Sequence, residues 1–305
     1  MNRSKILGAT ALASLMSAGV AQAEMSVSGY VLGAFADSDG GGVTNYHTSE
    51  TVTVSYTDSL DNGMGLAVSM NIKDTLQTAV TLDTGMGSVT FSGDGRGDSA
   101  LDKVDTSTAC FSMFWCSNAY NTTTYLDGDS QSNNSVRYTS PDINGFTIIA
   151  SVGTASAEDI NRTNSMGVTG SLMGVTLKAG FADIDYDQGG VGYLTGSSNV
   201  DRTSSMYALG YSIAGLDLGY AFYDSDDTAS SEETQYGVGT SVMGMYVGAQ
   251  FGAHDSTGND IDYMTLSAIK DMGAASFSYE YIEQDTAGGD TGDLDTHIVA
   301  YSIGF

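Results

Sequence analysis

Short glycine-containing turns alternate with longer acidic segments along this chain of 305 residues, and no other feature of the sequence restricts its fold as much. Between these connections, apolar and polar residues alternate with a period of two, which is the pattern of strands that have one apolar face. Leu66, Val68, Met70 and Ile72 share such a face. The short turns occupy residues 61–65, 83–87, 141–146, 172–175, 213–216, 242–245 and 271–274.

The longer connections fall at the opposite ends of the strands. A soluble sheet protein has no reason to place all its short turns at one end, whereas a transmembrane barrel has short periplasmic turns and long outer loops. Closure into a barrel also removes the sheet edges, whose polar groups lipid cannot satisfy. The longer connections occupy residues 37–47, 73–75, 94–133, 154–161, 184–201, 224–232, 254–260 and 284–294.

The pattern therefore predicts an all-β fold, a transmembrane antiparallel β-barrel of sixteen strands. Each strand has close to the roughly ten residues that cross a bilayer at a tilt. Because the number of strands is even, both termini of the chain fall on the side of the short turns. We expect the strands at residues 25–36, 48–58, 65–73, 76–82, 87–93, 134–140, 145–153, 162–172, 174–183, 202–213, 215–223, 233–242, 244–253, 261–270, 273–283 and 295–305.

Residues 1–23 have the order of regions found in secretory signal peptides. Two basic residues precede a small, apolar run at residues 6–20, and the AQA sequence at 21–23 matches a signal-peptidase site. We therefore expect residues 24–305 to form the outer-membrane barrel domain. No later stretch approaches the roughly 20 apolar residues that a membrane helix needs.

The formal net charge is −27 at pH 7, and loss of the signal peptide with its two basic residues makes it −29. Such a balance excludes nucleic acid as a partner, because nucleic-acid binding needs a basic face. The excess of acid attracts cations. Adaptation to a salty habitat accounts equally well for most of it.

The chain ends in a strand pattern in which Val299, Tyr301, Ile303 and Phe305 share one face. A terminal phenylalanine with apolar residues two and four positions earlier resembles the signal by which the outer-membrane assembly machinery recognises barrels. We therefore predict this machinery as a partner, through Phe305, and the outer membrane of a Gram-negative cell as the location. The alternative is a last strand that ends in phenylalanine by chance.

Two stretches resemble the general diffusion porins of the alphaproteobacterial, Rhodobacter type. Ser49–Lys73 (SETVTVSYTDSLDNGMGLAVSMNIK) matches that family's strand, glycine turn and strand, and Gly87–Asp94 (GSVTFSGD) matches the strand that leads into its long third loop. The resemblance implies a homotrimer of water-filled barrels, with the third loop folded into the lumen as a constriction. The second loop, at residues 73–75, is shorter here than the subunit-embracing loop of some porins.

The predicted pore constriction consists of charged residues of the third loop and of inward-facing strand positions. Acids on the loop that face bases on the wall would set up a transverse field, and the acid excess predicts a modest preference for cations. Simple solvation at a loop or rim is the alternative for each charge. The candidates are Asp94, Arg96, Asp98, Asp102, Lys103 and Asp105 on the loop, and Lys73, Arg137, Lys178, Arg202, Asp217 and Glu280 on the wall.

Both cysteines, Cys110 and Cys116, fall in the third loop. An even pair in an oxidising compartment favours a disulfide, which would close a small loop around Trp115. Two free thiols are the alternative. A metal site is less favoured, because no histidine lies nearby in the sequence.

Asp183, Asp185 and Asp187, followed by Gly189, have the look of a calcium-binding loop. The glycine is one place late for an EF-hand, and no glutamate closes the loop. Acidic outer loops could also hold divalent ions against lipopolysaccharide phosphates. A solvated strand end is the alternative, and no other cofactor is expected.

The sequence as a whole favours a passive channel for small hydrophilic solutes and ions, because sixteen strands enclose water whereas eight leave a packed core. A structural or adhesive barrel with partner-binding outer loops is the second interpretation. An outer-membrane enzyme is the third, but His47, His254 and His297 are scattered and form no recognisable catalytic spacing. We therefore expect no enzymatic activity.

Overall fold

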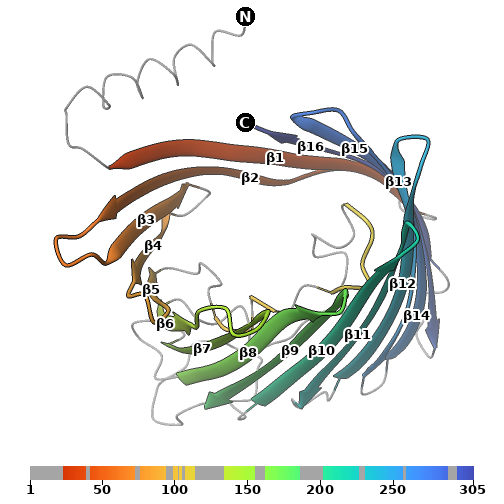
Figure 1. Ribbon diagram of the computed structural model, residues 1–305. Coiled ribbons are helices and arrows are strands. Elements are labelled where there is room, and N and C mark those ends of the chain that lie inside the picture. The colour runs from red at the N-terminus through yellow and green to blue at the C-terminus, as the bar shows by residue number, and fades with distance from the viewer. Residues whose placement is uncertain are drawn as a thin grey trace, which may run out of the picture.

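Sixteen strands form one closed antiparallel barrel in the computed structural model (Figure 1). Each strand pairs with its neighbours in the chain, and β1 pairs with β16 to close the ring. This confirms the predicted fold class. No helix in the described part of the chain is long and apolar enough to cross a membrane. The structure describes residues 23–38, 42–72, 76–93, 99–101, 103–104, 107–113, 134–154, 162–185, 202–226, 231–256, 259–287 and 294–305.

The strands follow one another around the ring without a crossover. Their bounds are β1 (Glu24–Ser38), β2 (Gly42–Ser59), β3 (Gly65–Ile72), β4 (Leu76–Asp83), β5 (Ser88–Gly93), β6 (Asn134–Thr139), β7 (Phe146–Thr154), β8 (Arg162–Leu172), β9 (Val175–Asp185), β10 (Arg202–Ile213), β11 (Leu216–Asp226), β12 (Ser231–Val242), β13 (Met245–Ser256), β14 (Asn259–Asp271), β15 (Ala275–Ala287) and β16 (Leu294–Gly304).

Side chains of successive residues point alternately to the outside and to the lumen. Outward positions carry large apolar side chains that remain exposed, such as Leu218, Phe251 and Tyr279. Inward positions on the same strands carry small or polar residues such as Ala221 and Ser278, which are buried. The exposed apolar band is the surface that a membrane barrel presents to lipid.

Several strands extend beyond the predicted ends into the acidic connections. The largest difference is at β2, which begins at Gly42 rather than at residue 48. Its early residues pair with the end of β1 after a register shift between Leu32 and Gly33. The predicted first loop at residues 37–47 is therefore mostly strand. Backbone pairing continues past the apolar band, where the side chains no longer alternate in polarity.

The short connections are tight hairpins, as predicted. In four of them a residue and the glycine after it both have positive φ: Asn144 and Gly145, Met173 and Gly174, Ala214 and Gly215, Met243 and Gly244. Two such residues in a row are the signature of a type I′ turn, whose twist matches that of the flanking strands.

Candidate functional site

The described residues of the third loop lie against the inner wall of the barrel. They occupy residues 99–101, 103–104 and 107–113, and they run inside the ring of strands in Figure 1. Their contacts pass in order from β7 to β15. This part of the loop therefore crosses more than half of the strands on their lumen side.

The loop is first fixed at β7 and β8. The backbone N–H of Ala100 donates to Ser151 Oγ at 2.8 Å and to Ser165 Oγ at 3.0 Å, and these two hydroxyls are 2.6 Å apart. Leu101 and Val104 are fully buried and pack in one cluster with wall residues that include Ala182 and Met206. Apolar burial and satisfied backbone groups together stabilise this end of the loop.

Six consecutive strands, β8 to β13, each contribute an inward-facing glycine under the loop. We call these positions the glycine groove. A Cβ at Gly219 would overlap the carbonyl oxygen of Thr108, and a Cβ at Gly237 would overlap that of Ala109. The loop backbone can approach the wall this closely only because these wall positions have no side chain. The glycine groove comprises Gly167, Gly180, Gly210, Gly219, Gly237 and Gly248.

Hydrogen bonds hold the middle of the loop in this groove. The Thr108 hydroxyl lies 2.6 Å from the carbonyl oxygen of Leu209 and 2.9 Å from that of Tyr220, and it can donate to one of them at a time. On β14, Ser267 Oγ donates to the carbonyl oxygen of Phe111 at 2.7 Å. The Phe111 ring also lies 6.0 Å, centroid to centroid, from that of Tyr246.

Glu280 on β15 anchors the far end of the described loop. Its carboxylate accepts hydrogen bonds from the backbone N–H of Met113 at 2.8 Å and from Ser278 Oγ at 2.9 Å. Glu280 is completely buried. The prediction placed Glu280 on the inner face, where it lies, and among the constriction residues; the structure shows that the loop covers it. The alternation of side chains reveals which face a residue occupies, but not what covers it.

Three other predicted charges have described side chains on the wall. Arg137 is half-buried on β6, where its Nη2 donates to Thr90 Oγ1 at 3.5 Å. Lys178 is half-buried on β9. Asp217 lies near the short-turn end of β11 and accepts hydrogen bonds from Ser212 Oγ at 2.5 Å and Tyr246 Oη at 2.8 Å.

The remaining predicted constriction residues are only partly covered by the structure. Lys103 is exposed on the loop. Arg202 is the first residue of β10, and its side chain is not among those described. Outside the described residues lie Lys73, Asp94, Arg96, Asp98, Asp102 and Asp105.

Cys110 is disulfide-bonded and lies between two groove-seated residues, Ala109 and Phe111. The chain contains two cysteines. Cys116 lies outside the described residues, so its pairing with Cys110 remains a prediction.

The predicted calcium loop begins within a strand. Asp183 and Asp185 belong to β9, and Asp183 lies on the outer face of the sheet, whereas the side chain of Asp185 is not among those described. Asp187 lies outside the described residues. Within the described ranges, no group of three or more histidine, cysteine, aspartate or glutamate side chains is arranged to hold a metal ion.

A buried polar cluster that the sequence did not indicate lies on β12 to β14, beside the seat of Phe111. The Glu233 carboxylate accepts hydrogen bonds from Tyr263 Oη and Gln235 Nε2, both at 2.7 Å, and Gln250 Nε2 lies 3.3 Å from Tyr263 Oη. All four side chains are buried. Such a connected network fixes the relative position of neighbouring strands.

The wall from β2 to β5 presents small polar side chains to the lumen. Thr53 Oγ1 donates to Asn71 Oδ1 at 3.0 Å, and the hydroxyls of Thr81 and Thr90 are 2.9 Å apart. Most inward residues here are half-buried rather than fully covered, Ser69 among them. This hydroxyl- and amide-rich surface suits contact with water.

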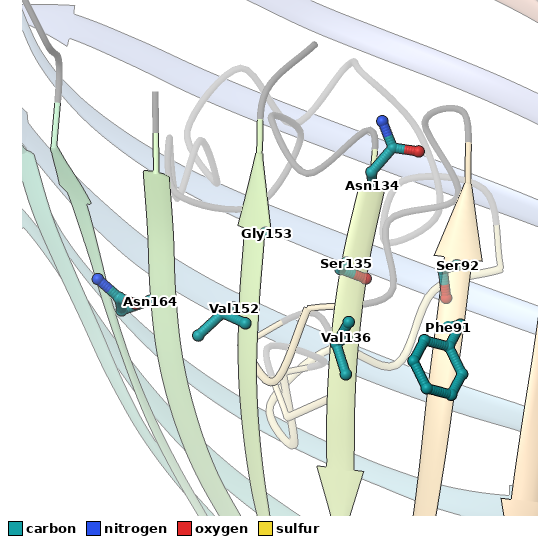
Figure 2. A pocket seen from close by; sticks show the side chains of 8 residues that line it. All are labelled: Phe91, Ser92, Asn134, Ser135, Val136, Val152, Gly153 and Asn164. Atoms are coloured by element: carbon teal, nitrogen blue, oxygen red, sulfur yellow. The ribbon is translucent and has the colours of Figure 1, made fainter. Parts of the chain in front are cut away.

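A depression of about 590 Å³ lies at the outer ends of β5 to β8 (Figure 2). Its exposed apolar side chains, Phe91, Val136 and Val152, are outward-facing. It is therefore a feature of the outer surface and separate from the groove that holds the loop. Its lining consists of Phe91, Ser92, Asn134, Ser135, Val136, Val152, Gly153 and Asn164.

The sequence matches the model of one protein family, and the structure is similar to many solved structures. A family model described as Gram-negative porin matches residues 8–305. A search of curated proteins finds no match.

Among solved structures, outer-membrane expressed OmpT of Vibrio cholerae has a TM-score of 0.71 at 13% identity, over 94% of this chain and 99% of that chain. The trimer form of in-vitro folded OmpT has a TM-score of 0.68 at 14% identity, over 93% and 100%. A triple mutant of Rhodopseudomonas blastica porin has a TM-score of 0.63 at 17% identity, over 92% and 100%. At these identities the structures show a shared fold alone.

Proposed function

Because this chain belongs to the Gram-negative porin family, as its sequence resemblance implied, we propose that it conducts small hydrophilic solutes and ions by passive diffusion. Porins are outer-membrane channels, so the location and the general class of function follow from the family. Membership in a family of channels also agrees with the expectation that the chain is not an enzyme.

The observation that carries the proposal is the division of the inner wall. The described loop residues are seated on β7 to β15, where they bury apolar side chains and satisfy their backbone groups. The wall from β2 to β5 instead presents hydroxyl and amide groups. A channel of this kind would pass solutes between the seated loop and the polar wall, with its width set by the position of the loop.

We further propose that the channel prefers cations modestly. The support is the net charge of −27 together with acids on the inner wall such as Asp217. In a planar bilayer with a tenfold gradient of potassium chloride, the reversal potential is expected to have the sign that indicates potassium permeation. A reversal potential of the opposite sign would contradict cation preference while leaving the channel itself intact.

We propose that Cys110 and Cys116 form the disulfide within the loop. The support is the bonded state of Cys110 and the presence of one other cysteine in the chain. Intact mass after iodoacetamide treatment of the denatured, unreduced protein is expected to be unchanged, with two thiols modified after reduction. Two modified thiols before reduction would refute the bridge.

A trimer is the proposed assembly, since the trimer form of OmpT shares the fold of this chain. Native mass spectrometry of the detergent-extracted protein is expected to give three times the chain mass. A purely monomeric species at all detergent concentrations tested would count against it.

A further inference from the structure

Three consecutive short turns form an apolar arc on one rim of the barrel. They are residues 172–175 between β8 and β9, 213–216 between β10 and β11, and 242–245 between β12 and β13. We propose that this apolar arc is immersed in the phospholipid leaflet at the short-turn side of the membrane and fixes the depth of the barrel there. The other turns of the rim would then remain in water.

The tips of the first and third turns of the arc are methionines that make almost no contacts within the protein, and the tip of the middle turn is Ala214. Met173 is 92% exposed and Met243 is 93% exposed. Scattered apolar residues on a surface need no explanation, but a continuous exposed apolar patch indicates an interaction site. Methionine is a flexible apolar side chain that adapts to irregular partners.

The backbone conformation at these two methionines also supports an apolar environment for the arc. Met173 and Met243 have φ values of 54° and 52°, in the left-handed region that disfavours side chains such as methionine. The turn between β6 and β7 has the same pair of positive φ values, but there the positions carry Asn144 and Gly145. Asparagine and glycine are the usual residues of such turns in water. At Met173 and Met243 an apolar side chain occupies the strained position, which an apolar surrounding would stabilise.

The arc continues the lipid-facing surface of the wall without a break. The residues flanking each turn form outward-facing pairs: Leu172 with Val175, Ile213 with Leu216, and Val242 with Met245. Five of these six side chains are 39–53% exposed. The medium that covers the wall is lipid, because the chain is an outer-membrane barrel, and the turn tips extend that surface.

Charge distinguishes the arc from the rest of the rim. No charged residue occurs in the three turns of the arc, whereas the remaining short turns carry Asp61, Asp83, Asp142 and Asp271. The nearest cation is Lys270 on β14, whose Nζ donates to the carbonyl oxygen of Gly244 at 2.6 Å. The Lys270 ammonium lies level with this turn, where it can reach the lipid phosphates while the apolar turn residues lie among the acyl chains.

Lipid fits the arc better than a second copy of the chain or a periplasmic protein would. Either would have to contact turns spread over six strands and also the apolar wall that continues from them. A bilayer contacts both at once. The tilt of the membrane surface relative to the rim would leave Met86 and Met272, which lie in acid-bearing turns, in water.

Oxidation by chloramine-T, a water-soluble oxidant, tests the proposal on the unmodified chain in phospholipid vesicles. Sulfoxide formation at each methionine is followed by peptide mass spectrometry and normalised to the rates in the urea-unfolded chain. Met86 and Met272 are 77% and 65% exposed, so protein burial alone predicts that Met173 and Met243 react faster. Immersion predicts the reverse order, with Met173 and Met243 roughly fivefold or more slower because the oxidant stays in water.

Equal or faster oxidation of Met173 and Met243 in vesicles would overturn the proposal. If Met173 and Met243 react fast in vesicles but slowly in native outer membranes, the proposal is also overturned, because a protein of that membrane would then cover them. Slow oxidation in vesicles that persists when the chain is diluted to one copy per vesicle supports lipid and excludes a second copy.

Discussion

Replacing Gly237 with alanine is expected to displace residues 107–113 from the inner wall and to lower the conductance of the open channel. The added Cβ would overlap the carbonyl group of Ala109, whose backbone atoms cannot rotate away, and it would also lie 2.6 Å from Cε2 of the Phe111 ring. Overpacking of this kind costs about 1–3 kcal/mol of stability. Movement of the loop away from β12 carries it toward the lumen, so the channel should narrow.

The matched control is Gly304→Ala, which also adds one methyl group to the inner wall. A Cβ there would meet the carbonyl oxygen of Gly29 at 3.8 Å, an ordinary contact. The two variants are compared by single-channel conductance and by the temperature at which the folded band is lost on electrophoresis. If Gly237→Ala matches the control in both measurements, the loop is not seated in the glycine groove.

Replacing Glu280 with alanine is expected to release the far end of the described loop. The carboxylate binds the backbone N–H of Met113 inside a fully buried site, and its removal leaves that donor without this acceptor. The loss of a buried hydrogen bond to a charged group costs roughly 2–3 kcal/mol. A loop held at fewer points fluctuates more, so the current noise of the open channel should rise.

Glu280→Gln separates the loss of the hydrogen bond from the loss of the charge. Its amide oxygen can still accept from Met113 N–H, so the noise should stay close to that of the unmodified chain. Larger noise in Glu280→Ala than in Glu280→Gln is the expected order. Equal, low noise in both variants would show that Glu280 does not hold the loop.

The strands could be predicted closely because each combines a two-residue period with a glycine turn at one end. The bounds predicted for β8 and β10 are those observed. Prediction failed at the outer end of β2, where residues 42–47 pair with β1 although their polarity does not alternate. Backbone hydrogen bonds there are satisfied by strand pairing, and side-chain pattern carries no information about them.

The site could be predicted only in part. The sequence pattern indicates on which face of a strand a residue lies, but not whether another segment covers that residue. Side-chain alternation placed Glu280, Arg137 and Lys178 on the inner wall. It could not show that the loop buries Glu280, because that depends on a contact between residues 167 positions apart. The sequence analysis did not identify the glycine groove, because strand glycines alone do not reveal which segment approaches them.

The most direct test of the central proposal is the single-channel conductance of the purified, folded chain in a planar lipid bilayer. A water-filled channel should give discrete current steps that increase linearly with small voltages and with salt concentration. Preparations that show the heat-sensitive mobility of a folded barrel but insert without current steps would contradict a diffusion channel.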